Sequence, residues 1–400
     1  MITYNLKLIT MNHKTIICAA LAISLAACNS GKSNLGYEIV TLQEEKLPPV
    51  QQLQLEKIDL PEDYTMGRNS LYIYQDSVLI VSKFQNPFPM KKMVTLVNLN
   101  NGEIIGDYFT NGRGPRELLA SYTQLSFNHL DIMCPSGKLV PINLDSAIMR
   151  GNDYKPDIIR TERDDFPSEW CSVDDTLFLT GNDYYFDGII DGCESYTKLP
   201  EFYWFSKSGR CIPEYNASDY IGVKYKMDNI SREYFSINKQ KNRVVCFNAY
   251  RPYAKVFDME LNLIKRINGP EPDDGKYRID DFMDGVWWNE SYGRNFYYRS
   301  PYGDDENIFV LNERTHRFVE KEIDTQHLQE SVQENIDYML KTVDANTELF
   351  RFDWDGNLIA RYSIGGKHLY GGITYSKSSN TLYFCILDGD GECYMYKAKL

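Results

Sequence analysis

Short hydrophobic runs separated by polar turn residues recur along the chain, and this pattern predicts an all-β fold. In the clearest recurring hairpin, an apolar pair is followed by a polar turn and a second apolar pair. Turn dipeptides such as Asn101-Gly102 and Asp355-Gly356 supply the positive φ that tight hairpins need. Copies of this hairpin occupy residues 96–105, 204–213, 256–265 and 351–360, with looser copies at 139–149 and 309–319.

A second pair of strands precedes most of these hairpins, as Leu71–Tyr74 and Val78–Ser82 do for the first copy. The repeating unit is therefore four strands over roughly 45–60 residues, a period typical of propeller blades. At the end of the chain, the strands between residues 372 and 397 are one short of a blade, and the spare strand Leu53–Leu60 would complete it. Counting the opening pairs predicts an all-β, six-bladed β-propeller closed by this N-terminal strand.

Residues 304–347 do not fit the repeat. They contain a spare hairpin copy and then the segment Leu328–Leu340, whose apolar positions have helical spacing. We interpret the region as a partly helical insertion in the last blade but one. A seventh, degenerate blade is the alternative.

The N-terminal residues have the pattern of a signal peptide. An apolar run broken only by Ser24 extends over residues 16–27. It is too short to cross a bilayer, which takes about 20 residues. The run ends in Leu25-Ala26-Ala27-Cys28, which resembles the lipobox of bacterial lipoproteins, where the Cys thiol takes a diacylglycerol and the chain is cut before it. We predict a signal peptide over residues 1–27, with translation starting at Met11, and lipid on Cys28.

Lipid on Cys28 would hold the mature chain on a membrane, because two or three acyl chains bind far more firmly than one. Residues 28–50 are rich in Gly, Ser and Asn and end near Pro48-Pro49, which predicts a flexible tether. The remaining residues, 51–400, are predicted to form a single propeller domain.

Charge and cysteine content narrow the function classes. The formal net charge of −13 becomes 41 − 56 = −15 once residues 1–27, which hold two Lys and no acid, are removed. Such an acidic chain is not expected to bind nucleic acid. The other Cys have irregular spacings and no C-x-x-C motif, so small buried hydrophobic residues are expected rather than a zinc or redox site. A disulfide between Cys385 and Cys393 is the alternative for that pair.

Two stretches resemble the TolB-like six-bladed propeller lipoproteins common in Bacteroidetes. The link Gly112–Leu118 is similar to their G-x-G-P-x-E-[FL] motif. The second stretch is Phe352–Asn357, followed by Gly372–Tyr375 and Leu382–Phe384. Over most of residues 50–400, the resemblance implies a six-bladed propeller in an exported, lipidated protein. It implies no catalytic residues.

Two kinds of turn-rich motif resemble sites for an anion or for calcium, but ordinary turns explain both. The run Gly112-Arg113-Gly114-Pro115 could cradle an anion on its backbone amides, but a turn between blades needs the same residues. Asp353–Asn357 and Asp388–Glu392 resemble the start of a calcium loop. Because strands flank both, we interpret them as hairpin turns.

Some six-bladed propellers hold a metal in the central channel with carboxylate, Asn and His ligands and hydrolyse lactones or esters. None of the four His of the mature chain lies in a recognisable ligand spacing, and solvated loops explain the acidic runs. No metal or other cofactor is therefore predicted. The acidic runs and His concerned are Asp164-Asp165, Asp273-Asp274, Asp280-Asp281, Asp304-Asp305-Glu306, His129, His316, His327 and His368.

Consecutive aromatic residues are the remaining candidates for ligand contact. Neighbours in a strand point to opposite faces, so one of Trp287 and Trp288 would pack between blades while the other is more exposed. Tyr184 and Tyr185 form a comparable pair. Packing between blades is the alternative role for all four rings.

These observations favour a membrane-anchored, cell-envelope binding or scaffold propeller with a protein or glycan partner over an enzyme. A metal-dependent hydrolase with its site in the central channel is the alternative. Surface-exported lipoproteins of Bacteroidetes usually carry acidic residues just after the lipidated Cys, whereas here no acid occurs between Cys28 and Glu38. We therefore expect attachment to the outer membrane, with the propeller on its periplasmic face.

Overall fold

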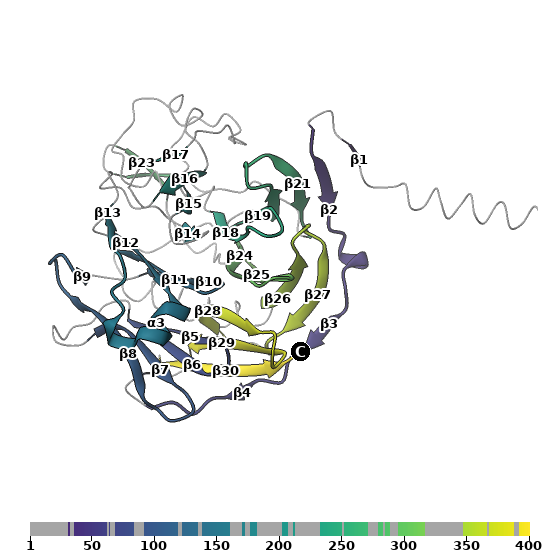
Figure 1. The fold of residues 1–400 in the computed structure, drawn as a ribbon. Coiled ribbons are helices and arrows are strands. Elements are labelled where there is room, and N and C mark those ends of the chain that lie inside the picture. The colour runs from purple at the N-terminus through teal and green to yellow at the C-terminus, as the bar shows by residue number, and fades with distance from the viewer. Residues whose placement is uncertain are drawn as a thin grey trace, which may run out of the picture.

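Antiparallel sheets follow one another around a ring in the computed structural model of this chain (Figure 1). Within each sheet, strands that follow each other along the chain are hydrogen-bonded neighbours. The all-β propeller predicted from the sequence is confirmed. The structure describes residues 31–32, 36–61, 64, 69–83, 92–118, 122–134, 138–160, 170–172, 177–181, 202–206, 211–212, 233–249, 252–270, 279–282, 285–288, 295–316, 347–365, 368–387 and 392–400.

Five blades share this plan, and contacts between the first strands of neighbouring blades place those strands toward the centre of the ring. In chain order, the blades are β5 (Asn69–Tyr74), β6 (Val78–Lys83), β7 (Lys92–Asn98) and β8 (Ile104–Asn111); β10 (Tyr122–Ser126), β11 (His129–Cys134), β12 (Lys138–Asn143) and β13 (Ile159–Arg160); β18 (Glu233–Asn238), β19 (Arg243–Asn248), β20 (Tyr253–Phe257) and β21 (Leu263–Asn268); β24 (Asn295–Gly303), β25 (Asn307–His316), β26 (Thr347–Asp353) and β27 (Leu358–Ser363); and β28 (His368–Ser376), β29 (Thr381–Leu387) and β30 (Cys393–Lys399) with β4 (Glu56–Lys57).

The count of five corrects both the predicted six blades and the alternative of seven. A further four-stranded sheet lies between the second and third blades in the chain, but only Cys171 and Ser172 of its strands have described side chains, so it is left out of the count. Its strands are β14 (Trp170–Ser172), β15 (Leu177–Gly181), β16 (Phe202–Ser206) and β17 (Cys211–Ile212).

The two strands that precede the fourth blade in the chain form a sheet of their own. β23 (Gly285–Trp288) pairs with β22 (Ile279–Phe282) in a separate two-stranded sheet, not with β24. β25 contains most of the supposed spare hairpin and pairs with both β24 and β26. The strand at 307–316 is therefore part of a blade and not of an insertion, whereas the segment Leu328–Leu340 lies outside the described residues.

The N-terminal segment runs along the outer edges of three blades (Figure 1). β2 (Glu38–Thr41) pairs in parallel with β21, β3 (Val50–Gln52) pairs in parallel with β27, and β4 pairs antiparallel with β30. The last pairing completes the fifth blade, as predicted for Leu53–Leu60. We call residues 38–57 the N-terminal strap. The predicted flexible tether was to reach residue 50, but strands of the strap pair with the propeller from residue 38 onward. The short strand β1 (Gly31–Lys32) and the 3₁₀ turn η1 (Glu44–Lys46) flank β2.

Tyrosine side chains join neighbouring blades, which accounts for part of the high tyrosine content of the chain. The Tyr72 hydroxyl of β5 donates a 2.7 Å hydrogen bond to the Thr123 carbonyl of β10. The Tyr302 hydroxyl of β24 donates a 3.3 Å hydrogen bond to the Tyr375 carbonyl of β28. Both rings are buried, so each tyrosine fills apolar space between blades while its hydroxyl keeps a partner.

The described cysteines behave as the small buried hydrophobic residues that the sequence predicts. All five are buried and none forms a disulfide. Leu387 stands opposite Cys393 in the last hairpin, and Met395 stands opposite Cys385, so that hairpin does not align the two thiols. The five are Cys134, Cys171, Cys246, Cys385 and Cys393.

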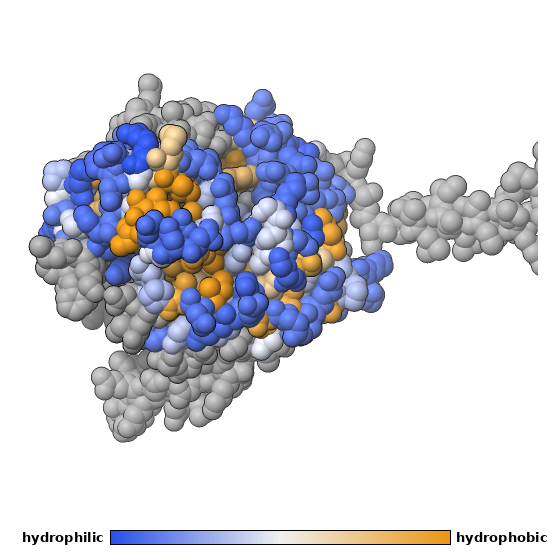
Figure 2. Space-filling view, turned by 60° about the horizontal axis from the view of Figure 1, so that its bottom comes forward, coloured by the Kyte–Doolittle hydropathy of each residue, from blue (hydrophilic) through white to orange (hydrophobic). Residues whose placement is uncertain are grey.

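The surface is mainly hydrophilic, and Figure 2 shows hydrophobic residues gathered in patches on one face of the molecule. Exposed apolar residues are normal on the surface of globular proteins. None of the described helices is long and apolar enough to cross a bilayer. Among the described residues, the exposed large hydrophobic side chains are Val50, Ile104, Tyr122, Met149 and Ile359.

Candidate functional site

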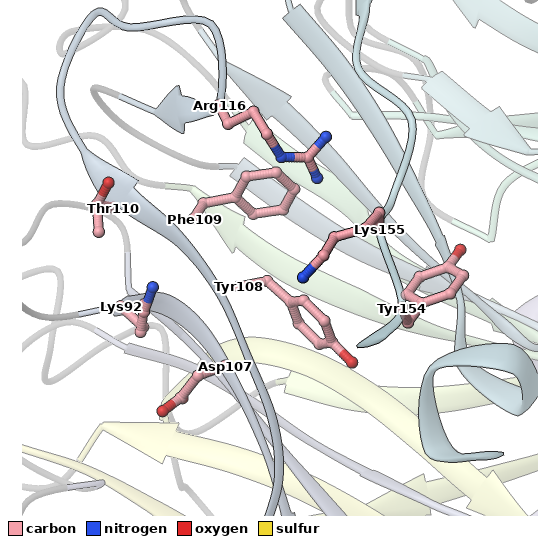
Figure 3. A pocket seen from close by; sticks show the side chains of 8 residues that line it. All are labelled: Lys92, Asp107, Tyr108, Phe109, Thr110, Arg116, Tyr154 and Lys155. Carbon is pink, nitrogen blue, oxygen red and sulfur yellow. The ribbon is translucent and has the colours of Figure 1, made fainter. Parts of the chain in front are cut away.

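A cleft of about 230 Å³ opens beside β8 in the first blade (Figure 3). It combines cationic and aromatic side chains from β7, β8, the link after β8 and the loop after the second blade's helix. We name it the β8 cleft. Its lining residues are Lys92, Asp107, Tyr108, Phe109, Thr110, Arg116, Tyr154 and Lys155.

Two consecutive aromatic residues of one strand line the β8 cleft, which a regular strand would not allow. Neighbouring side chains of a strand point to opposite faces. Phe109, however, has φ +59°, outside the β region. Tyr108 and Phe109 are both buried and both contribute to the lining. A bulky residue in this conformation costs about 1–3 kcal/mol and persists where its surroundings fix it, often at a functional site.

Tyr108 is held by the loop that forms the opposite wall. Its hydroxyl donates a 3.0 Å hydrogen bond to the Gly151 carbonyl, and its ring meets that of Tyr154 edge to face at 6.1 Å. Burial, with contributions from Tyr154 and Asp107, raises the pKa of Tyr108 to about 12. A Cβ on Gly106 would lie 2.8 Å from the Tyr108 Cζ, so this ring position requires glycine two residues earlier.

A short helix sets the position of the opposite wall. α3 (Leu144–Arg150) begins where the Asn143 side chain accepts a 2.9 Å hydrogen bond from the Ser146 amide, a typical N-cap. It ends at Gly151, whose φ of +52° starts the 3₁₀ turn η2 (Gly151–Asp153). The chain leaves this turn with Tyr154 against the cleft, and the Tyr154 hydroxyl accepts a 3.1 Å hydrogen bond from the Asn143 amide.

The cations of the β8 cleft are partly fixed by backbone carbonyls. Arg116 donates a 3.2 Å hydrogen bond to the Pro156 carbonyl, and its guanidinium lies 6.0 Å from the Phe109 ring centre. Lys155 Nζ donates a 2.7 Å hydrogen bond to the Asn152 carbonyl. Lys92, on β7, is exposed. The cleft therefore presents fixed positive charge over an aromatic floor.

One carboxylate, that of Asp107, lies among these cations, and it accepts a hydrogen bond from within the protein. Asp107 Oδ1 accepts a 2.6 Å hydrogen bond from the Thr95 hydroxyl on the neighbouring strand. With Lys92, Arg116 and Lys155 facing a single acid, the lining carries a net positive charge within an acidic protein.

The link Gly112–Leu118 positions Arg116 and folds around the carboxylate of its own Glu117. The Gly114 amide donates a 2.7 Å hydrogen bond to Glu117 Oε2, and a Cβ on either Gly112 or Gly114 would collide with this carboxylate. Lys138 Nζ donates 2.7 Å hydrogen bonds to the Gly114 and Glu117 carbonyls. The chain's own Glu117 thus fills the space that an anion would need, in agreement with a turn between elements.

Of the two calcium-loop candidates, the structure describes Asp353–Asn357, which forms a hairpin turn, in agreement with our interpretation of the sequence. Asp353 Oδ1 accepts hydrogen bonds from the amides of Asp355 and Asn357, at 3.0 and 2.8 Å. Asp258 holds the amide of Asn262 in the same way at 2.8 Å. These acids are therefore committed to turn geometry in two blades, while the residues at 388–391 lie outside the described part of the chain.

Within the described residues, no group of three or more His, Cys, Asp and Glu is placed to hold a metal ion. In the acidic run at 304–306, Asp304 Oδ1 accepts hydrogen bonds from the amides of Glu306 and Asn307, at 2.7 and 2.6 Å. Glu306 also pairs with Lys377 at 2.8 Å. This run therefore shapes a turn.

The residues predicted for the site lie elsewhere in the chain. Cys28, Tyr184 and Tyr185 are outside the described residues, and Trp287 and Trp288 are described only as backbone of β23. The sequence reasoning missed the β8 cleft. The signal available for it was the consecutive aromatic pair Tyr108-Phe109, which ends two residues before the glycine-rich link.

Comparisons with known proteins agree with the fold. No family model matches the chain, and no curated protein matches it. Among solved structures, it is similar to a member of the DUF4221 family from Bacteroides vulgatus, with a TM-score of 0.52 at 13% identity over 88% of this chain and 99% of that one. It is also similar to virginiamycin B lyase from Staphylococcus aureus, with a TM-score of 0.40 at 11% identity over 87% of this chain and 100% of that one. The first similarity supports a β-propeller fold for this chain.

Proposed function

We propose that this protein is a binding propeller, held on the bacterial envelope by lipid on Cys28, and that it holds its ligand in the β8 cleft. The cleft carries the proposal. Its two tyrosines and two of its cations hydrogen-bond to backbone groups before a ligand arrives, which reduces the ordering cost of binding. Its single acid, Asp107, accepts a hydrogen bond from Thr95, and the three cations around it favour binding of an anionic group.

The N-terminal strap supports a membrane-proximal position for the propeller. If lipid is attached to Cys28, only the residues between it and Glu38 separate the anchor from the first strap strand. At about 3.4 Å per residue, this stretch reaches about 35 Å at most. The propeller would then sit close to the outer membrane, on its periplasmic face, where envelope proteins and glycans are available as partners.

The anchor is tested with Cys28→Ser in the native host. The variant should leave the membrane fraction or keep an uncut signal peptide. A variant that is processed and membrane-bound like the wild type would refute anchoring through Cys28.

The cleft is tested with the full-length, detergent-extracted protein on an array of envelope glycans and peptides. Thr110→Trp should fill the cleft without changing its charge and should abolish binding of whichever arrayed molecule the wild type retains. Unchanged binding by this variant would show that the ligand site lies elsewhere.

A further inference from the structure

We infer that the β8 cleft takes one acidic sugar, a pyranose ring that carries a carboxylate. The inference rests on the proposed binding function and names the chemical class of its ligand. It depends on three features of the lining, which are its charge, its aromatic surface and its size.

The charge of the lining is opposite to that of the whole protein. The chain carries a formal net charge of −13, yet the cleft sets Lys92, Arg116 and Lys155 around one acid that Thr95 already engages. Guanidinium and ammonium groups form their strongest hydrogen bonds with anionic oxygens. A ligand with a negative group is therefore favoured over a neutral one.

The aromatic surface and the size of the cleft favour a ring over an isolated ion. Tyr108 and Phe109 form a buried floor, and the half-buried Tyr154 forms part of a wall. Aromatic rings offer an apolar face together with a polar hydroxyl, which suits a ligand with one face of C–H groups and an edge of hydroxyls. The volume of about 230 Å³ is below the ~300–1,000 Å³ of sites for drug-sized ligands, so a single sugar ring is the expected size.

The test uses the full-length protein in detergent and calorimetric titration with D-glucuronate, D-glucose and inorganic sulfate. Glucose has the same ring without the carboxylate, and sulfate is an anion without a ring. We expect glucuronate to bind at least about tenfold more tightly than either, because a charge-assisted contact and a ring contact each contribute. Equal binding of glucose and glucuronate, equal binding of sulfate and glucuronate, or no binding of glucuronate would each overturn the inference.

Variants link the binding to the lining. Lys92→Gln removes one exposed cation of the cleft and should weaken glucuronate binding several-fold while leaving glucose unchanged. Lys46→Gln, an exposed cation on the N-terminal strap, is the matched control and should change neither. If Thr110→Trp abolishes binding of a neutral arrayed ligand, the proposed function stands and the acidic-sugar inference fails.

Discussion

The Tyr383 hydroxyl donates a 2.6 Å hydrogen bond to Oδ1 of Asp76, 307 residues earlier in the chain. Asp76 occupies the turn between the first two strands of the first blade, and Tyr383 lies on β29 of the last blade. The hydroxyls of Ser376, Ser378 and Ser379 also donate to the Asp76 carboxylate, at 2.6–2.8 Å. One carboxylate therefore gathers four donors and joins the two ends of the ring.

This junction predicts a stability loss at low pH. Partial burial by itself would raise the pKa of Asp76, but the hydrogen bonds from Ser376, Tyr383, Ser379 and Ser378 outweigh it and lower the pKa to about 2, from 3.8. The stabilisation is therefore complete above pH 4 and is lost as the pH falls towards 2. Asp76→Asn should lower the free energy of unfolding at pH 7 by about 1.5–3 kcal/mol, the contribution of hydrogen bonds to a charged group.

Urea unfolding at several pH values checks this prediction. Asn tolerates the left-handed backbone that Asp76 adopts, at φ +58°, so the substitution tests the charge and not the turn. The difference between wild type and variant should shrink between pH 4 and pH 2. A difference that stays constant over this range would show that the charge of Asp76 is irrelevant to the junction.

For Asp131 we predict the opposite pH dependence of the unfolding free energy, at higher pH than for Asp76. Asp131 is fully buried on β11 and accepts hydrogen bonds from both the amide and the hydroxyl of Ser172. Burial raises its pKa to about 6, although Ser172 and His129 oppose the shift. The folded state therefore holds this proton more tightly than the unfolded state, so the contribution of Asp131 to stability falls as the pH rises from 4 to 6.

Asp131→Asn should remove this dependence, because the amide does not titrate and can still donate to the Ser172 hydroxyl and accept from its amide. Relative to the wild type, the variant should gain up to about 3 kcal/mol between pH 4 and pH 7, from the two-unit shift at 1.36 kcal/mol per unit. Asp76→Asn is the control, and the difference in unfolding free energy between it and the wild type should stay constant from pH 4 to pH 7. Parallel stability curves for wild type and Asp131→Asn would contradict the prediction.

Arg361 forms ion pairs with two glutamates, one of them on the N-terminal strap, and comparing the two shows how much the strap's ion pair contributes to stability. Arg361 is buried and pairs with Glu348 at 2.7 Å and with Glu44 of the strap at 3.4 Å. The Glu348 side chain is 14% exposed and that of Glu44 is 58% exposed. Glu348→Gln should cost up to about 3–5 kcal/mol, because it leaves the buried Arg361 with only the more distant and exposed Glu44 as a partner. Glu44→Gln should cost about 0–1 kcal/mol, as exposed ion pairs do. Equal melting temperatures for the two variants would refute this ranking.

Local features of the fold could be predicted from the sequence because short-range chemistry decides them. The strands at 71–74 and 78–82 lie within β5 and β6, and the turns at Asp258 and Asp353 use the hydrogen bonds of their own residues. Closure by the strand at 53–60 followed from the need to cover an edge.

Long-range features could not be predicted in this way. The segment at 285–288 pairs with 279–282 and not with the strand that follows it, and nothing in its composition distinguishes the two partners. The strap strand at 38–41 could not be recognised, because the polar, glycine-containing residues before it indicate a flexible segment. The β8 cleft depends on the backbone conformation of Phe109, which breaks the alternation that sequence reasoning assumes.

The shape of the β8 cleft depends on Gly106, because the Tyr108 ring occupies the space that a side chain at this position would need. Replacing a strand glycine by alanine normally stabilises a protein by about 0.5–1 kcal/mol, because the unfolded chain loses freedom. Here the added Cβ would meet the Tyr108 ring, whose Cζ lies 2.8 Å away, and the ring is held by its bond to Gly151. Gly106→Ala should instead destabilise the protein by about 1–3 kcal/mol and weaken ligand binding in the cleft.

The sign of this effect separates a ring collision from a general strand effect. In a Tyr108→Leu background, the collision disappears and Gly106→Ala should become neutral or stabilising, which a double-mutant cycle of unfolding free energies would measure. If Gly106→Ala stabilises the wild type as well, the Tyr108 ring is free to move and cannot form a fixed floor. The preorganisation on which the proposed binding site depends would then be lost.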